Sequence, residues 1–266
     1  MHVTINGTAY WYELQGDGEP VVLLHGFTGT AGTWTNLIQD MADTFQVLTL
    51  DLPGHGRTGQ DPAKTMETFC RDLAGLLDEL EWQQVYLIGY SMGGRAALSF
   101  ALVYPERVAS LILESASPGL DGKTERETRR QRDENLAQWI ELDGIEAFVA
   151  YWENIPLFQS QKQLPKAVRD QLRAERLSHS EKGLAQSLRY MGTGKQPSWW
   201  GLLEQLRLPV LLLTGEWDQK FINLNQAMER LLPEAEHIVI KGAGHAIHVE
   251  QPATFGKIVN EYLQSS

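Results

Sequence analysis

Ser91 is the residue of this chain whose sequence surroundings best suit it for chemistry. It is the third residue of a Gly-Tyr-Ser-Met-Gly segment, which follows an apolar run at 85–88 and precedes a helix-like run at 95–104. Gly-x-Ser-x-Gly between a strand and a helix is typical of a tight turn that lifts a serine oxygen clear of a sheet. The N–H of Met92 would lie at the start of the helix, where the backbone favours negative charge. The segment predicts an activatable hydroxyl beside an oxyanion-binding N–H.

A serine of this kind needs a base, and the base needs an acid that orients it. Asp218 and His245 occur in the expected order, each on a loop that follows an apolar run typical of a strand. Both loops lie beyond the carboxyl ends of their predicted strands, which is where open α/β sheets place their sites. We expect Asp218 to fix the tautomer of His245, which then accepts the proton of Ser91. Glu114, at the end of the preceding predicted strand, is the alternative acid, and Glu216 is a third candidate earlier in the loop of Asp218.

A second oxyanion-binding N–H is expected from the Leu-His-Gly-Phe segment after the apolar run at 21–24. A His-Gly-x segment at such a position lends the N–H of its third residue, here Phe27. His25 is interpreted as a structural residue that holds the loop backbone, and His55 and His248 as structural or surface residues. No histidine cluster has the spacing of a metal site, so we expect neither a metal nor another cofactor.

Short apolar runs alternate with helical patterns over most of the chain. This alternation predicts an α/β fold in which a mostly parallel sheet has helices on both faces. The alternation stops at about 119–207, where the pattern is helical without strand signals. We interpret 119–207 as a helical cap inserted after the sixth strand, between core parts at 1–118 and 208–266. The eight predicted strands lie at 3–5, 9–14, 21–24, 47–50, 85–88, 108–113, 209–213 and 237–240.

Composition narrows the choice of partner and compartment. The 266 residues carry a formal net charge of −11, which argues against nucleic acid or an anionic membrane as the main partner. No run approaches the roughly 18 apolar residues of a membrane span, and no signal-peptide pattern is visible. The single cysteine, Cys70, suits a reducing cytosol. We expect a cytoplasmic monomer that acts on a small molecule.

The cap segment is unusually rich in arginine for an acidic protein. Residues 119–207 hold 14 of the 23 Lys and Arg residues but only 13 of the 34 Asp and Glu residues. Opposite charges on solvated helix faces account for most of them. We assign to this class Arg126, Arg130, Arg132, Arg169 and Arg173.

Over essentially its whole length the chain resembles the α/β-hydrolase superfamily. The resemblance rests on the His-Gly pair at 25–26, the Asp-x-Pro-Gly-His-Gly segment at 51–56, the turn at Ser91, and the later Asp218 and His245. Within the superfamily the chain resembles the 2-succinyl-6-hydroxy-2,4-cyclohexadiene-1-carboxylate synthases of menaquinone biosynthesis. Four segments carry this second match, at 89–95, 117–120, 151–158 and 172–177.

The resemblance implies substrate-binding roles for Arg95, Arg129 and Arg176, and for Tyr90 and Trp152. Arg95 stands where esterases usually have a small apolar residue, and it lies four residues after Ser91, so the two side chains share a helix face. A guanidinium in a cleft that binds a neutral ester would be unfavourable, because a partly buried cation needs a partner of opposite charge. It suits a substrate carboxylate, which arginine binds in bidentate fashion.

The assignments of the three arginines and of Trp152 each have a structural alternative. Arg95 could form an ion pair with a carboxylate of the core, and Arg129 and Arg176 could lie on a solvated cap helix. Trp152 could pack in the interior of the cap. Arg173, three residues before Arg176, is the alternative second arginine of the cap.

The resemblance implies a lyase that eliminates pyruvate from 2-succinyl-5-enolpyruvyl-6-hydroxy-3-cyclohexene-1-carboxylate. In that reaction the serine, deprotonated through the histidine, removes the proton beside the succinyl ketone. Negative charge then develops on the carbonyl oxygen, where the N–H groups of Phe27 and Met92 would face it. The spacing of the triad residues does not separate this elimination from hydrolysis. The alternatives are a carboxylesterase or carbon–carbon hydrolase on the same scaffold, and a non-enzymatic binding member, which would have no need of a complete triad.

Overall fold

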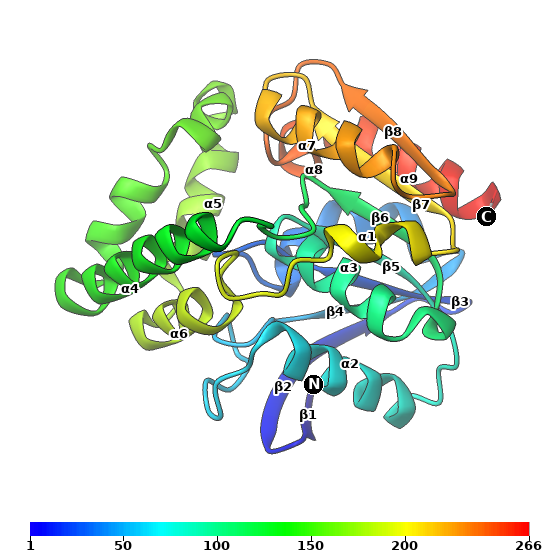
Figure 1. Ribbon diagram of the computed structural model, residues 1–266, viewed down its shortest axis with the longest axis horizontal. Helices are drawn as coiled ribbons and strands as arrows, with labels where there is room; N and C mark the ends of the chain where they lie inside the picture. The colour runs from blue at the N-terminus through cyan, green and yellow to red at the C-terminus, as the bar shows by residue number, and fades with distance from the viewer. Residues whose placement is uncertain (266) are drawn as a thin grey trace.

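The computed structural model describes residues 1–265 and contains an eight-stranded sheet at its centre (Figure 1). In spatial order the strands are β1 (His2–Ile5), β2 (Thr8–Gln15), β4 (Phe45–Leu50), β3 (Glu19–Leu24), β5 (Val85–Tyr90), β6 (Val108–Glu114), β7 (Val210–Gly215) and β8 (Ala235–Ile240). β2 pairs with β1 and with β4 in antiparallel fashion, and the other neighbours are parallel. The predicted mostly parallel α/β fold is confirmed.

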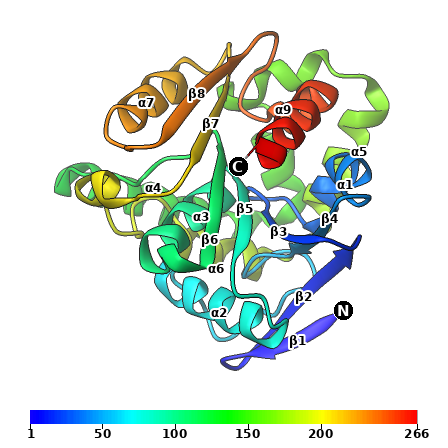
Figure 2. The same ribbon diagram turned by 90° about the vertical axis from the view of Figure 1, so that its right-hand side faces the viewer.

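Helices cover both faces of this sheet (Figure 2). They are η1 (Ala31–Trp34), α1 (Thr35–Met41), α2 (Met66–Glu79), α3 (Met92–Val103), η2 (Pro105–Arg107), α7 (Gln219–Glu229), α8 (Ile247–Glu250) and α9 (Pro252–Ser265). Val22 and Leu24 of β3 belong to a buried cluster with α2 and α3, whereas Val21 and Leu23 belong to a second cluster with α1 and α9. Because successive strand side chains point to opposite faces, a continuous apolar run is buried on both.

Between β6 and β7 the chain forms a separate group of helices, seen apart from the sheet in Figure 1. These are α4 (Lys123–Trp152), η3 (Pro156–Gln163), α5 (Lys166–Leu177) and α6 (Glu181–Met191). The short η4 (Trp200–Gln205), which also lies between β6 and β7, packs against the core through Leu203. α4 changes direction at Gly144, whose φ of 84° is readily adopted by glycine. None of the helices described within 1–265, α4 included, is long and apolar enough to cross a membrane.

The helical group has a small apolar core of its own. Ile140 and Phe148 of α4 are fully buried against Leu184 and Leu188 of α6. Phe27, on the loop after β3, packs against this cluster and also against the core beneath the sheet edge. The loop predicted to carry an oxyanion N–H is therefore also a contact between the two layers of the molecule.

Candidate active site

Ser91 occupies a strained turn between β5 and α3. Its φ of 50° and ψ of −104° lie outside the regions that most residues favour. A Cβ atom on Gly89 would lie 2.5 Å from the carbonyl oxygen of Gly93, and one on Gly93 would lie 2.1 Å from that of Leu24. Backbone segments thus approach too closely for side chains on either glycine. The turn presents Ser91 to a cavity at the carboxyl edge of the sheet.

Asp218, His245 and Ser91 form a continuous hydrogen-bonded chain. The Nδ1 of His245 lies 2.6 Å from Oδ2 of Asp218, and its Nε2 lies 3.0 Å from the Oγ of Ser91. An ionised carboxylate accepts at Nδ1, so this contact leaves Nε2 free to accept the serine proton. The Oδ1 of Asp218 also accepts from the N–H of Phe221 at 3.4 Å, at the start of α7. Asp218 is therefore held at the start of α7, the helix that follows it.

Aromatic rings hold the imidazole of His245 in place. Its centroid lies 4.7 Å from the ring of Phe221, 5.4 Å from that of Tyr90 and 6.2 Å from that of Phe158. The side chain is 2% exposed. Rings on several sides limit rotation of the imidazole, which maintains the alignment that proton transfer requires.

The alternative acids have other partners. Both carboxylate oxygens of Glu114 lie within 2.9 Å of Nδ1 of His248, and Oε1 also accepts from the N–H of that residue at 3.1 Å. Glu216 accepts from the N–H of Gly242 at the surface. Of the three carboxylates considered from the sequence, Asp218 is the one in contact with His245.

The two residues expected to provide oxyanion N–H groups both line the cavity beside Ser91. Met92 is the first residue of α3, where the N–H has no acceptor in the preceding turn. Phe27 follows His25, whose Nε2 accepts from the N–H of Leu52 at 2.9 Å and whose Nδ1 lies 2.7 Å from the carbonyl oxygen of Gly26. Burial lowers the pKa of His25, so the ring is neutral and serves to hold this loop.

The cavity has a volume of about 730 Å³ and a basic lining in an otherwise acidic protein. Apolar walls come from the core and the cap, including Phe27, Trp152, Leu157, Phe158 and Leu188. The charged lining residues are Arg95, Arg129, Arg132, Lys220, Glu125 and Asp133. Four cations facing two carboxylates give the cavity the charge expected of a site for a polyanion.

Arg95 is buried at the wall of this cavity, with 9% of its surface exposed. Its Nη1 donates to the carbonyl oxygen of Met191 and to the side-chain carbonyl of Gln196. Within the described residues no carboxylate lies within 4.0 Å of the guanidinium. Burial lowers the pKa of Arg95, and the charge of Arg129 lowers it further. The alternative of an ion pair with a core carboxylate is therefore absent from the structure.

Arg129 and Asp133 belong to α4 and lie close to Arg95 of α3. The Nε of Arg129 donates to Oδ1 of Asp133 at 2.8 Å, and both line the cavity. Oδ2 of Asp133 is buried and has no hydrogen-bond partner among the described atoms. Burial raises the pKa of Asp133, against the opposing effect of Arg129. Two arginines and one carboxylate thus leave a positive charge at this end of the cavity.

Arg176 lies in a smaller space behind Tyr90 and Phe27, and it is absent from the lining of the large cavity. The side chain is buried, and its Nη2 donates to Oε1 of Gln161 at 2.9 Å. Its guanidinium carbon stands 5.1 Å from the centre of the Phe158 ring. Arg173 is half-exposed and forms an ion pair with Glu153. Of these two cap arginines, Arg176 is the buried one, separated from the large cavity by aromatic side chains.

Tyr90 and Trp152 form part of the aromatic wall. Tyr90 lines the cavity next to Ser91, and burial raises the pKa of its hydroxyl well above the ordinary value. The ring of Trp152 stacks on Phe148 at 5.4 Å and meets Phe27 edge-on at 5.4 Å. Its indole nitrogen is buried and has no acceptor within the described part of the chain. Trp152 therefore both packs in the cap and faces the cavity.

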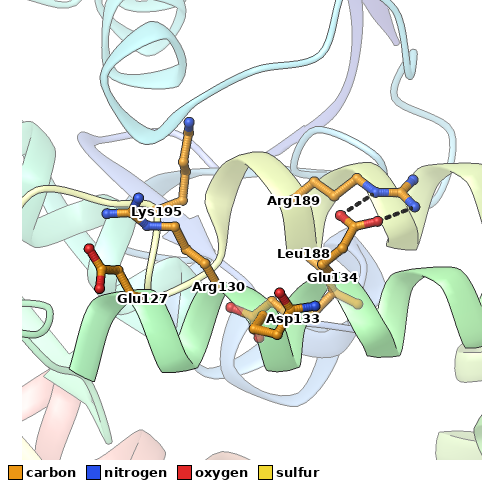
Figure 3. A pocket seen from close by; sticks show the side chains of 8 residues that line it. Glu127, Arg130, Asp133, Glu134, Leu188, Arg189 and Lys195 are labelled. Carbon is orange, nitrogen blue, oxygen red and sulfur yellow. Dashed lines mark hydrogen bonds and ion pairs between the residues drawn. The ribbon is translucent and has the colours of Figure 1, made fainter. Parts of the chain in front are cut away.

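Several cap arginines have structural partners. Figure 3 shows a pocket between α4 and α6, where Arg189 of α6 reaches Glu134 of α4. Arg189 also pairs with Glu141, and Arg130 donates from Nε to the carbonyl oxygen of Gly194 at 2.8 Å. These contacts hold α6 and the loop after it against α4. The interpretation of Arg130 as a solvated surface charge was incomplete, since it also secures this loop.

Two cations of the cavity were missed by the sequence analysis. Arg132 was assigned to a solvated face, although its spacing of three from Arg129 places both on one side of α4. Lys220 follows Asp218 by two residues on the first turn of α7, and no motif marks it. No set of three His, Cys, Asp or Glu side chains that could hold a metal ion occurs within residues 1–265.

The strained serine turn, the hydrogen-bonded triad and the mostly parallel sheet define an α/β hydrolase. A family model described as the α/β-hydrolase fold matches residues 19–252, so the chain belongs to this family. A Bacillus subtilis protein, provisionally named a 2-succinyl-6-hydroxy-2,4-cyclohexadiene-1-carboxylate synthase, is 50% identical over 93% of this chain and 91% of its own. Other bacterial relatives bear that name without reservation. Within the α/β hydrolases the chain belongs to this synthase family.

Solved structures agree with this placement. MenH from S. aureus superposes with a TM-score of 0.92 at 36% identity, covering 96% of this chain and 98% of its own. A thermophilic esterase from Thermogutta terrifontis, solved with malate bound, has a TM-score of 0.89 at 31% identity, covering 100% and 98%. A lyase family and an esterase thus share one backbone, and the side chains of the cavity must distinguish them.

Proposed function

We propose that this protein is a carbon–oxygen lyase of menaquinone biosynthesis. It eliminates pyruvate from 2-succinyl-5-enolpyruvyl-6-hydroxy-3-cyclohexene-1-carboxylate and forms 2-succinyl-6-hydroxy-2,4-cyclohexadiene-1-carboxylate. Its family supports this reaction, since relatives covering more than nine-tenths of the chain carry the name of the synthase. The charge of the cavity supports it independently, because this substrate bears carboxylates.

In this proposal Ser91 is a base rather than an acylating nucleophile. His245 takes the serine proton, and the serine oxygen removes the ring proton beside the succinyl ketone. The electron pair of that C–H bond forms a ring double bond, the existing double bond shifts, and the C–O bond to the enolpyruvyl group breaks. The oxygen leaves with the pyruvate enolate, which takes up a proton. No water is consumed. Asp218 keeps the imidazole in the required tautomer throughout.

The N–H groups of Phe27 and Met92 are assigned to the carbonyl oxygen that becomes negative during proton removal. Donors already directed at the position where charge develops lower the barrier without reorganisation. Arg95 and Arg129 are assigned to a carboxylate of the substrate. Arg176 is assigned to a supporting position behind Tyr90 and comes into contact with substrate if the aromatic wall moves.

The observation that carries the proposal is the position of Arg95. A buried charge without a partner destabilises a protein by several kcal/mol. A hydrolase of neutral esters would gain no substrate binding from such a charge at the cavity wall. Its partners in the structure are the neutral acceptors Met191 and Gln196. A carboxylate of the substrate supplies the missing charge.

Pyruvate release from the enolpyruvyl substrate, measured beside hydrolysis of p-nitrophenyl acetate, tests the proposal. Arg95→Ala should lower kcat/KM for pyruvate release by at least about 100-fold, as expected when one member of a buried charge pair is removed. Ester hydrolysis should change by less than about threefold, since that substrate offers no charge to the arginine. Arg207→Ala, at an exposed position, is the matched control. Absence of pyruvate release by the wild type would refute the lyase.

A hydrolase is the second candidate, favoured by two observations. The triad distances of 2.6 Å and 3.0 Å are those of an assembled nucleophile, and an esterase shares the backbone. A hydrolase would form an acyl-enzyme on Ser91, detectable by mass spectrometry after a rapid acid quench. A lyase gives no such adduct with its own substrate.

The cap, compartment and oligomeric state are parts of the same proposal. We infer that 119–207 act as a lid between core parts 1–118 and 208–266, excluding water from the cavity. The single buried cysteine suits the cytoplasm, and the net charge of −11 disfavours binding to nucleic acid or an anionic membrane. We propose that the protein is a monomer. Light scattering of the purified protein measures the oligomeric state directly.

A further inference from the structure

Lys220 is a cation of the catalytic cavity with no role in the triad or in the arginine group. It lines the cavity that contains Ser91 and His245. It also lines an adjoining space of about 450 Å³, beside Trp217, which reaches the other side of His245. Leu157 and Lys220 stand between the two spaces, since both belong to each lining.

The ammonium group of Lys220 has no carboxylate partner. Over residues 1–265 no acidic oxygen lies within 4.0 Å of its Nζ, which lies 5.5 Å from the centre of the Phe221 ring. It is the second residue of α7, whose first turn holds no acidic residue. A cation at the positive end of a helix is unfavourable, so helix stability does not explain a lysine here.

The position of Lys220 is tied to the triad. Asp218 precedes it by two residues and caps the helix through the N–H of Phe221. Phe221 in turn packs on the imidazole of His245 at 4.7 Å. The lysine therefore extends from a segment that both the acid and the base hold in place.

The cations of the cavity fall into two groups. Arg95, Arg129 and Arg132 come from α3 and α4, around Asp133. Lys220 comes from α7, next to the histidine. The three arginines and the carboxylates of Glu125 and Asp133 together leave one positive charge, which matches one substrate carboxylate at the far end. A second carboxylate, near the bond that breaks, needs a cation beside the base.

We propose that Lys220 binds the carboxylate of the enolpyruvyl group and retains it on pyruvate as that product leaves through the adjoining space. This inference rests on the proposed lyase function. As the C–O bond breaks, the departing fragment carries its carboxylate and an enolate oxygen, so a lysine at this point stabilises the leaving group and gives it a route away from the ring product. The exposed ammonium group can follow the anion because its stem is flexible.

The test compares Lys220→Gln with Lys220→Arg, which keeps the charge. Lys220→Gln should raise KM for the enolpyruvyl substrate about 5-fold to 10-fold, the size expected for one charge-assisted hydrogen bond at a partly exposed site. The inhibition constant of added pyruvate should rise by a similar factor. Lys220→Arg should restore both to within about twofold, since the charge is kept.

Lys257→Gln, which changes a surface lysine paired with Glu261 on α9, is the matched control and should change neither constant. Hydrolysis of p-nitrophenyl acetate should be equal in all four proteins, since that ester has no carboxylate. Pyruvate inhibition that is absent from the wild type, or equal in wild type and Lys220→Gln, would overturn the inference. If the wild type releases no pyruvate at all, the lyase itself fails, and this outcome is distinguished by the first assay.

Discussion

Arg95 and Gln196 are joined by a hydrogen bond from the guanidinium to the side-chain carbonyl oxygen, although they are 101 residues apart. The Nε2 of Gln196 is buried and without a partner among the described atoms. The amide therefore orients a cation without neutralising it. Gln196 lies in the loop after α6, whereas Arg95 belongs to α3 of the core, so this hydrogen bond links the helical group to the core. The site keeps its charge available and its geometry ready.

Gln196→Glu should weaken binding of the polycarboxylate substrate. The new carboxylate would pair with Arg95 and compete with the substrate for the same charge. We expect KM for the enolpyruvyl substrate to rise at least about tenfold, equivalent to about 1.4 kcal/mol. Steady-state pyruvate release measures this, with p-nitrophenyl acetate as the uncharged control. An unchanged KM would mean that Arg95 does not meet a substrate carboxylate.

Ser91→Ala and His245→Ala should each remove most turnover and leave the fold intact. Loss of either member of a coupled triad lowers kcat by at least about 1,000-fold. Ser91 also adopts a strained φ of 50°, which an alanine would share, so the melting temperature should shift by only a few degrees. Calorimetry beside the rate assay separates the roles. A large drop in melting temperature with retained activity would make these residues structural.

Asp218→Asn and Glu114→Gln are a matched pair of substitutions, because each removes the charge of a carboxylate that contacts a histidine. The first should lower kcat by orders of magnitude because the amide favours the wrong tautomer of His245. The second should destabilise the protein by about 1–3 kcal/mol, since His248 loses a buried charged acceptor, with kcat changed less than about threefold. Urea unfolding and initial rates measure both. The reverse pattern would return the role of the acid to Glu114.

Stability should depend on pH through Asp133. Because burial raises its pKa in the folded protein, the folded chain binds this proton more tightly than the unfolded chain. The free energy of unfolding then falls as pH rises from the unfolded pKa of about 3.9 through the higher folded value, by at most about 1.4 kcal/mol per pH unit. Arg95 and Arg129, which face the carboxylate, stay charged over this range.

Urea unfolding of the wild type and of Asp133→Asn, at intervals between about pH 4 and pH 7, measures this dependence. The difference between the two free energies removes the contribution of the other carboxylates. The difference, wild type minus variant, should decrease as pH rises. A difference that is flat or increases would show that the pKa of Asp133 is not raised.

Much of the core architecture could be predicted because its signals are local. Four-residue apolar runs such as 21–24 predict strands that are buried on both faces, and the structure places Val21 and Val22 in opposite layers. The cap was harder to predict in detail. The sequence predicts only a helical pattern over 119–207, whereas α4 turns at Gly144, and Phe158 of the short η3 packs against Trp152 and His245. The contact with His245 joins residues that are far apart along the chain.

The sequence by itself determined the α/β fold, the turn at Ser91, and the order of serine, acid and histidine, because strand and helix periods and glycine conformations depend on neighbouring residues. Only the tertiary structure decided which carboxylate serves which histidine: Asp218 is 27 residues from His245, and Glu114 is 134 residues from His248. It also decided that Lys220 joins the cavity and that Arg176 stands behind its wall. Such contacts depend on how separate loops pack at the carboxyl edge of the sheet. The spacing of residues along the chain does not determine the distances between those loops.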